Sequence, residues 1–420
     1  MVTLRSLFGE HAVILRETNY QLLIAATVLP ILGTSLLSPV LDTLTGPYAT
    51  SAADIGLLIS AYSIPHVFAI PLVGVLTDRY GRKPLLVAGL VVFGIGGVAM
   101  PLTTNFELAL ALRLLQGVGG AGLNPVIIIA IGDLYAGNRE ETGQGLRFAA
   151  SGLSGAVLPL AAGVIVAIGW QLPFLLYALA FPVAAMVFAW MDEPTDVETT
   201  TDGGSRRAYR RELAGLFRHN RVRAMAIARV LPPIAWFAFI TYNSIVIVRL
   251  LGSTPAVAGL MTSVASLVFA LVASQAGRVT AAFDSRFYPL IGGNICLGVG
   301  TGLLALAPSV SVVALGVAIL GIGNGITLSL YRSIMTDLAP QDLRGGLVSL
   351  TEAGGWLAAT LAPVILGTAI AAGTATLGFR QALQLSILGT AILVGVGGII
   401  CMIAVRTSAP VTVATNRALE

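Results

Sequence analysis

Twelve long apolar runs constrain this 420-residue chain more than any other feature of its sequence. The hydrocarbon core of a bilayer is about 30 Å thick and takes about 20 apolar residues per helix. Strands of a membrane β-barrel would alternate polar and apolar residues over about 10 positions, and these runs do not alternate. We therefore predict an all-α integral membrane protein with twelve spans, at 20–41, 55–76, 84–102, 107–131, 148–168, 171–190, 224–248, 256–276, 287–307, 310–331, 346–371 and 381–405.

The composition excludes a soluble protein. Charged residues make up 10% of the chain and hydrophobic residues 56%, whereas an ordinary soluble domain is about 25% charged. Cys296 and Cys401 lie inside apolar runs, and the three histidines are scattered, so the sequence predicts neither a disulfide framework nor a metal site. We expect no cofactor.

The basic residues divide unevenly between the two sets of loops. Arg249 and Arg380 are the two in the loops after the odd-numbered spans, whereas the termini and the other loops hold 20 of the 24. The positive-inside rule therefore places both termini in the cytoplasm. This placement also accounts for the net charge of +4 without nucleic acid. Arg113 and Arg229 remain within the predicted spans.

One long polar segment, 192–223, joins six spans to six. It begins with acidic residues and ends with arginines, which is typical of a solvated linker beside anionic headgroups, although a regulatory segment is the alternative. We expect five parts in the chain: a tail at 1–19, a six-helix bundle at 20–191, the linker at 192–223, a second bundle at 224–405 and a tail at 406–420.

A shift of 204 residues maps the first bundle onto the second. It places Asp133 on Asp337, Pro159 on Pro363 and Gly163 on Gly367, and it also aligns the limits of the spans. Parallel repeats of this kind are typical of transporters whose substrate site lies between the two halves.

The end of the second span carries a dense motif of charge and glycine, which includes Gly74, Asp78, Arg79, Gly81, Arg82 and Lys83. It resembles the G-x-L-x-D-R-x-G-R-K/R-x-x-L signature of the major facilitator superfamily. The resemblance implies that Asp78 meets the amino end of span 11, at Gly345 and Gly346, and that Arg82 or Arg79 pairs with Asp133. These contacts would hold the outward-open state and break as the halves rock.

The copy of this motif in the second half is decayed. It runs from Gly277 and Arg278 to Asp284 and Arg286, and it lacks most of the signature positions. Such decay is usual in the family that the motif resembles.

The fourth span carries an arginine within its apolar run. Arg113, Gln116 and the glycines that follow resemble the R-x-x-Q-G-x-G-x-A signature of proton-linked members of the family. Because an arginine at mid-membrane costs about 2.5–3.5 kcal/mol on insertion scales, Arg113 should face either a wet cavity or a partner. The alternative role is a structural tether between helices.

The fifth span partly resembles the signature of the family's exporters. Gly145, Pro159 and Gly163 fit it, whereas Ser154, Leu158 and Ala162 replace glycines. The matched positions favour export, whereas the replaced glycines weaken that prediction.

Few polar groups remain inside the spans. The resemblance implies a cavity lined by spans 1, 4, 7 and 10, so each of the following residues either lines it or ties helices together: Thr34, Ser35, Gln116, Asn124, Tyr242, Asn243 and Asn324. Candidates to carry a proton are Asp42, His66, Arg113 and Glu352. The alternatives are a solvated helix-end acid for Asp42, a packed neutral ring for His66 and a structural acid for Glu352.

Together these features predict a secondary transporter of the plasma membrane. We expect proton-coupled efflux of small amphipathic molecules by alternating access, with the substrate, protons and the bilayer as partners and the monomer as the working unit. Import or uniport of a small neutral metabolite is the alternative, and a non-transporting sensor or scaffold is a more remote one. The chain lacks HExxH, GxSxG and Walker motifs, which argues against an enzyme.

Overall fold

The computed structural model describes residues 10–193, 205–283, 285–340 and 343–407. Every regular element in these ranges is a helix. The expected tails and the acidic part of the linker lie partly outside the described residues, as does Asp284 of the decayed motif.

The first half comprises the helices before the linker. It contains η1 (Glu10–Arg16), α2 (Thr18–Ser35), α3 (Leu41–Leu44), α4 (Leu57–Tyr80), α5 (Arg82–Ala99), η2 (Met100–Leu102), α6 (Phe106–Ala121), α7 (Leu123–Leu134), α8 (Asn138–Ile165), η3 (Leu172–Leu179) and α9 (Ala180–Trp190). The fourth predicted span is divided between α6 and α7, which meet at Gly122.

The second half follows the linker helix α10 (Ser205–Leu216). It contains α11 (Asn220–Ser244), the π-helical turn η4 (Ile245–Leu250), α12 (Pro255–Ser274), α13 (Ala276–Ala281), α14 (Phe287–Leu306), α15 (Val310–Asp337), α16 (Arg344–Leu377) and α17 (Phe379–Thr407). Capping residues in the sequence determine where several of these helices begin. The Asn105 side chain accepts a hydrogen bond from the backbone N–H of Leu108 at 2.9 Å, and Thr254 caps α12 ahead of Pro255.

Among the described residues, ten helices are long and apolar enough to cross a membrane. An eleventh is α4, if its parts Leu57–Ala69 and Leu72–Tyr80, bent by 60°, are taken as one span. The remaining predicted span corresponds to α2, whose first turn is polar because it carries Thr18, Asn19 and Gln21. The helices therefore follow the predicted spans in order and are consistent with twelve crossings.

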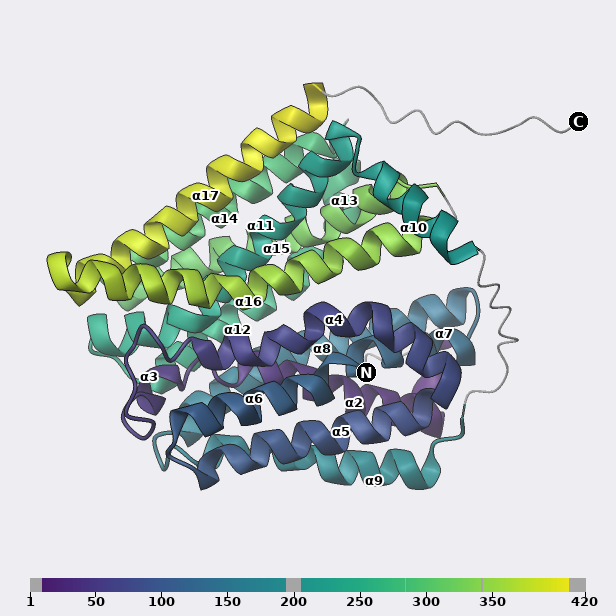
Figure 1. Ribbon diagram of the computed structural model, residues 1–420, viewed down its shortest axis with the longest axis horizontal. Helices are drawn as coiled ribbons and strands as arrows, with labels where there is room; N and C mark the ends of the chain where they lie inside the picture. The colour runs from purple at the N-terminus through teal and green to yellow at the C-terminus, as the bar shows by residue number, and fades with distance from the viewer. Residues whose placement is uncertain (1–9, 194–204, 284, 341–342, 408–420) are drawn as a thin grey trace, which may run out of the picture.

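The two halves form two bundles that face each other (Figure 1). Helices α4 and α16 lie along the contact between them, and α8 and α12 pack together on the same interface. The linker and both described chain ends lie at one end of the molecule, which we call the linker side; we call the opposite end the far side.

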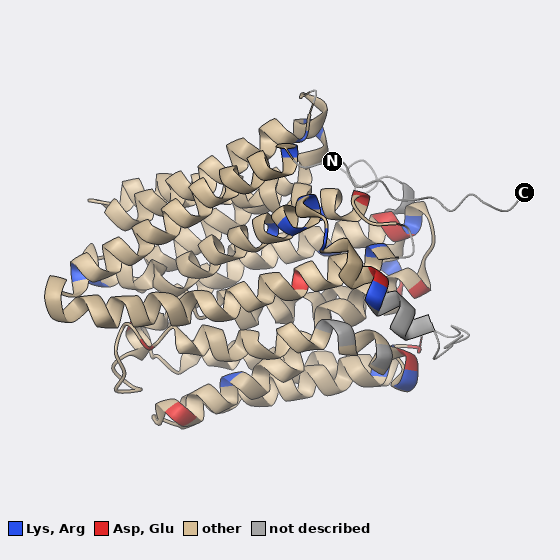
Figure 2. Cartoon of the chain, turned by 45° about the horizontal axis from the view of Figure 1, so that its top comes forward, with Lys and Arg blue, Asp and Glu red and all other residues tan. Residues whose placement is uncertain are grey.

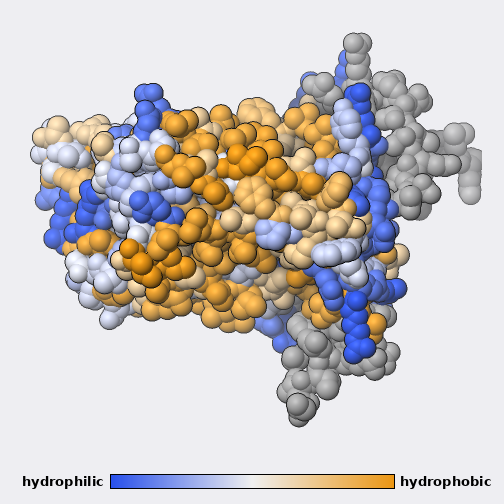
Figure 3. All heavy atoms as spheres, turned by 90° about the horizontal axis from the view of Figure 1, so that it is seen from below, coloured by the Kyte–Doolittle hydropathy of each residue, from blue (hydrophilic) through white to orange (hydrophobic). Residues whose placement is uncertain are grey.

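Charged residues gather at the linker side (Figure 2), and an apolar belt separates the polar ends on the face shown in Figure 3. Large apolar side chains are exposed in the described helices, for example Phe188, Leu271 and Ile400. A surface of this kind is suited to lipid rather than to water.

Helices α8 and α15 both extend beyond their predicted spans through polar turns. Helix α8 begins at Asn138 rather than near 148, and α15 continues to Asp337 rather than to about 331. The extra turns are polar, so hydropathy does not detect them, yet they bring Arg147 and Arg332 into the membrane-spanning helices. Arg113 and Arg229 are therefore not the only arginines within the spans.

The 204-residue repeat is reproduced in helix contacts. A Cβ at Gly119 would overlap Gly89 and Phe93, and a Cβ at Gly323 would overlap Gly293 and Leu297. Each residue of the second set lies 204 positions after its counterpart. The same shift relates the ion pair Arg82–Asp133, at 2.7 Å, to Arg286–Asp337, at 2.6 Å.

Candidate functional site

Glycines bring the two halves into close contact towards the far side. A Cβ at Gly163 in α8 would overlap the Pro255 carbonyl oxygen in α12, and one at Gly259 would overlap the Pro159 carbonyl oxygen. On the other side of the interface, a Cβ at Gly367 in α16 would overlap the Ala53 carbonyl oxygen. Helices can approach this closely because glycine has no side chain. Gly145, in contrast, has open space where a Cβ would lie, with no atom within 4 Å.

Polar contacts also join the two halves near the far side. We call this region of close contact the far-side closure. Asp42 Oδ1 lies 2.6 Å from Arg249 Nε, and Arg249 Nη2 donates to Thr45 Oγ1 at 2.7 Å. Nearby, Ser38 Oγ and Thr262 Oγ1 are hydrogen-bonded at 3.2 Å. Each of these contacts joins the first half to the second.

Asp42 lies beyond the end of α2, and its side chain is 11% exposed. Burial raises the pKa of its carboxyl above the ordinary value, against the opposing effects of the Arg249 charge and hydrogen bond. The far-side closure therefore favours the protonated form of Asp42 more than open water would.

An aromatic stack joins α4 to α16 within the interface. The His66 ring lies 4.0 Å from the Trp356 ring, stacked at 27°, and His66 Nδ1 lies 3.0 Å from the Tyr62 carbonyl oxygen. Closer to the far side, Ser60 Oγ donates to the Thr360 carbonyl at 2.7 Å. In this state the His66 ring packs between the Tyr62 and Trp356 rings.

At the linker side, the first half has a network of charges around the start of α5. Arg82 Nε donates to Asp133 Oδ2 at 2.7 Å, while Glu193 accepts from the backbone N–H groups of Arg82 and Lys83 at 2.5 and 3.0 Å. Gly81 has φ +86°, and a Cβ there would lie 2.7 Å from Glu193 Oε1. Glycine at position 81 thus satisfies both the backbone conformation and the close approach of Glu193.

The linker-side contact expected between the halves is not formed. Asp78 is 52% exposed and lies 3.9 Å from Arg82 Nη2, and no hydrogen bond or ion pair joins it to the described part of α16. A Cβ at Gly74 or at Gly345 would meet no atom within 4 Å. Gly346 lies in the first turn of α16, half-buried. Arg79 contacts the Tyr80 ring at 5.2 Å.

Arg113 is completely buried inside the first half. Its Nη2 donates to the Gly33 carbonyl at 2.8 Å and its Nε to the Leu58 carbonyl at 3.0 Å. Its Nη1 donates to Gln116 Oε1 at 2.6 Å, and the guanidinium lies 4.6 Å from the centre of the Tyr62 ring. Arg113 therefore finds partners on α2 and α4 rather than facing an open cavity.

Charges from both halves gather nearer the linker side. Glu352 Oε1 accepts from Arg229 Nη2 at 2.8 Å and from Arg332 Nη2 at 2.7 Å, which ties α16 to α11 and α15. Arg229 is 2% exposed, and its Nη1 lacks a hydrogen-bond partner in the described structure. Across the interface, Arg147 of α8 is close enough to Arg332 for the two charges to repel.

The remaining polar candidates are one tie between helices and several buried or half-buried groups. Asn243 Nδ2 donates to the Ala258 carbonyl at 2.8 Å and to Thr262 Oγ1 at 3.0 Å, so it ties α11 to α12. Tyr242 is buried and its hydroxyl has no described partner. Thr34 and Asn124 are half-buried, and Ser35 and Asn324 are 5% exposed.

Several residues at these contacts are not predicted from the sequence. In the sequence, Tyr62 and Trp356 resemble the other large side chains of their spans. Arg147, Glu193 and Arg332 resemble ordinary charges in loops. The sequence does offer one signal for Arg147 and Arg332: each directly adjoins a predicted span, 148–168 or 310–331, so a helix that continues by one residue includes it. Nothing local in the sequence marks the contact between Trp356 and His66, because the two residues are distant in the chain.

Described residues of the second half line at least two cavities. One, of about 640 Å³, opens at the linker side between α11, α14, α15 and α17. The other, of about 480 Å³, lies between α11, α16 and α17, and its side chains are apolar apart from Ser386 and Thr390. The described residues contain no group of three or more His, Cys, Asp or Glu side chains arranged to hold a metal ion.

Comparison with known proteins gives a family match along most of the chain. The model of the Major Facilitator Superfamily matches residues 23–246 and 225–419. Among solved structures, a bacterial homologue of the human lysosomal transporter Spinster superposes with a TM-score of 0.79 at 16% identity, covering 93% of this chain and 98% of that one. The D-xylose-proton symporter gives 0.67 at 15% identity, covering 90% and 96%. These likenesses show the fold.

Curated relatives match over shorter stretches. The bacillibactin exporter of Bacillus subtilis is 34% identical over 150 residues, which are 34% of this chain and 37% of that protein. Multidrug resistance protein 2 of the same organism is 26% identical over 172 residues, 41% of this chain and 43% of the relative. A chloramphenicol resistance protein of Pseudomonas aeruginosa is 28% identical over 186 residues, 42% and 44%. The matched region spans less than half of each relative.

Proposed function

Because this chain belongs to the major facilitator superfamily and is a multi-pass membrane transporter, we propose that it exports small amphipathic molecules in exchange for protons. The contact between α8 and α12 carries this proposal. Pro159 and Gly163, two matched positions of the exporter signature, lie where the halves meet. The names of the matched relatives, an exporter and two resistance proteins, also support export.

The distribution of charge supports the plasma-membrane orientation proposed from the sequence. With the arginine-rich linker side in the cytoplasm, the described state is the one closed to the outside, since the hydrogen bonds and ion pair that the described residues form between the halves lie towards the far side. Asp78 would then gain its α16 partners, Gly345 and Gly346, in the opposite state.

Proton coupling is proposed to use Asp42. Its carboxyl lies at the outer closure, where it joins the two halves through Arg249. A proton that binds Asp42 from outside favours closing, because burial in the closed state raises its pKa. Arg113 links α2, α4 and α6 and so couples the packing of the first half to this movement. His66 and Glu352 remain the other candidates for the proton.

The substrate is proposed to be amphipathic. Few charges lie within the spans, and the apolar cavity between α11, α16 and α17 offers a site that a lipid-soluble compound can enter. One charge that moves across 100 mV supplies about 2.3 kcal/mol, enough for roughly a fortyfold gradient of substrate.

Uptake of ethidium into inverted vesicles tests this function. We expect uptake that depends on a proton gradient and is lost in Arg113→Ala, while Arg380→Gln, which removes an exposed arginine on the far side, retains it. Uptake without a proton gradient, or full activity in Arg113→Ala, would contradict the mechanism. Flux of a neutral metabolite without a proton gradient would instead support the uniporter, and binding without flux the sensor.

A further inference from the structure

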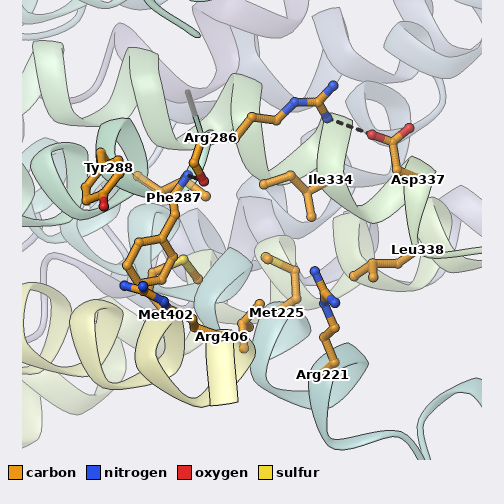
Figure 4. A pocket seen from close by; sticks show the side chains of 13 residues that line it. Arg221, Met225, Arg286, Phe287, Tyr288, Ile334, Asp337, Leu338, Met402 and Arg406 are labelled. Atoms are coloured by element: carbon orange, nitrogen blue, oxygen red, sulfur yellow. Dashed lines mark hydrogen bonds and ion pairs between the residues drawn. The ribbon is translucent and has the colours of Figure 1, made fainter. Parts of the chain in front are cut away.

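The cavity of about 640 Å³ at the linker side is lined by an apolar wall and a basic rim (Figure 4). Met225, Ile334, Leu338 and Met402 contribute to the wall. The charged lining residues are three arginines, Arg221, Arg286 and Arg406, against one acid, Asp337. The described lining is therefore positively charged.

The three arginines differ in how their charges are satisfied. Arg286 Nη1 donates to Asp337 Oδ2 at 2.6 Å, as the dashed line in Figure 4 shows. Arg406 lies over the Phe287 ring at 5.5 Å, a contact that leaves its N–H donors available. The Nε of Arg221 is buried and has no hydrogen-bond partner among the described residues. Arg221 and Arg406 thus offer donors that no described acid neutralises.

The internal repeat shows what fills the equivalent place in the first half. There, Arg82 pairs with Asp133, and a second carboxylate, Glu193, receives the backbone N–H groups at the start of α5. In the second half Arg286 pairs with Asp337 in the same way. No carboxylate from the described residues corresponds to Glu193 at the start of α14, and the cavity lies there instead.

We infer that this cavity binds a phosphate-bearing anion, which takes the position that the Glu193 carboxylate occupies in the first half. Guanidinium groups bind phosphate oxygens through paired N–H donors, and the amino end of a helix favours negative charge. The cavity lies at the linker-side end of the bundle, where charged side chains meet the apolar belt, with Tyr288 exposed beside it. Anionic phospholipid headgroups lie at that level of a membrane, and free phosphate in the cytoplasm shares their chemistry.

Native mass spectrometry of the full chain in detergent tests the inference. Wild-type protein is mixed with phosphatidylglycerol or with the zwitterionic phosphatidylcholine, and we expect about tenfold greater retention of the anionic lipid, equivalent to one charge-assisted hydrogen bond. Arg221→Gln and Arg406→Gln should each reduce that retention severalfold, and Arg406→Lys should restore part of it. Arg278→Gln removes the same charge from α13, outside the cavity lining, and should leave retention unchanged.

A thermal unfolding series with inorganic phosphate separates the two sources of the anion. Stabilisation by phosphate that Arg221→Gln abolishes, without selective retention of phosphatidylglycerol, assigns the cavity to the free anion. Equal retention of both lipids together with no effect of phosphate overturns the inference, as does selective binding that survives both glutamine variants. Because these readouts require no transport, they stand or fall separately from proton-coupled export.

Discussion

Gly81 combines two constraints at one residue. Its φ of +86° and ψ of 168° belong to a region that side chains strongly disfavour, and the Glu193 carboxylate lies against its α-carbon. The adjoining charged pair Arg82–Asp133 depends on this turn, because the turn sets the start of α5.

We predict that Gly81→Ala lowers the free energy of unfolding by about 1–3 kcal/mol, the usual cost of a strained backbone conformation. Thermal unfolding in detergent measures the loss. Gly74→Ala is the matched control, because a Cβ there meets nothing within 4 Å in this state. It should fold as well as the wild type. Equal stability of the two variants would contradict the explanation.

The carboxyl of Asp42 gives the far-side closure a pH dependence. Because burial raises its pKa in the closed state, closing takes up a proton. Lowering the pH should therefore favour closure, starting near the raised pKa and ending below about 3.9, the ordinary value for Asp. The stabilisation is fully present below that ordinary value and is lost as the pH rises through the raised one.

Spin labels at Thr104 and Ala375, both exposed on the far side of their halves, report the closure in a background without Cys296 and Cys401. We expect the short-distance population to grow as the pH falls in wild type and to be insensitive to pH in Asp42→Asn. Asp54→Asn, at an exposed far-side acid, should keep the response. A response that persists in Asp42→Asn would assign the effect to another group.

The sequence predicts some contacts of the charged residues and not others. The family resemblance implies that Asp133 pairs with Arg82 or Arg79, and the structure has the pair with Arg82 at 2.7 Å. The role of Glu193 is not predicted, because a carboxylate in a linker has no spacing that fixes its partner. Arg113 is expected to face a cavity or a partner, but which carbonyls it meets depends on helix packing that the sequence does not specify.

At the scale of elements, hydropathy locates the apolar centres of helices but not their polar ends. Helices α12 and α14 match their predicted limits within two residues. In contrast, α8 starts about 10 residues before its predicted span. The linker helix α10 is not predicted, because its basic sequence is typical of a solvated segment; Leu213 and Leu216 bury it against the second half.

The α8–α12 contact should be intolerant of added volume. We predict that Gly163→Val prevents far-side closure, because a branched side chain would overlap Pro255 and Ala256. Overpacking of this kind costs about 1–3 kcal/mol. The variant should be inserted in the membrane but should favour the outward-open state and lose transport.

Distances between Thr104 and Ala375 labels measure that shift, with ethidium transport measured in parallel. Gly145→Ala, in the same helix but with no neighbour within 4 Å, serves as the control and should behave as wild type. Normal closure in Gly163→Val would show that α12 can move aside and that the glycine is not required.

The whole molecule is a pair of repeats that meet through equivalent surfaces. The interface pairs α8 with α12 and α4 with α16, and each pair is the counterpart of the other under the 204-residue shift. We propose that the halves rock about the centre of this interface, near the His66–Trp356 stack. Such a motion would separate the halves at one side as they close at the other, and in this state Asp78 has no partner on the described part of α16.

Asp78→Asn should therefore alter the balance of states without affecting the described fold. Its carboxylate is 52% exposed here, so its loss should change thermal stability little, whereas the opposite state should lose a charge at the amino end of α16. Such contacts are worth about 0.3–2 kcal/mol, which predicts turnover slower by about twofold to thirtyfold.

Labels at Asn138 and Gln275, exposed on the linker side of the two halves, should report a larger linker-side-open population. Glu107→Gln, an exposed acid on the far side, should change neither. Wild-type turnover with unchanged distances in Asp78→Asn would remove this residue from the gate.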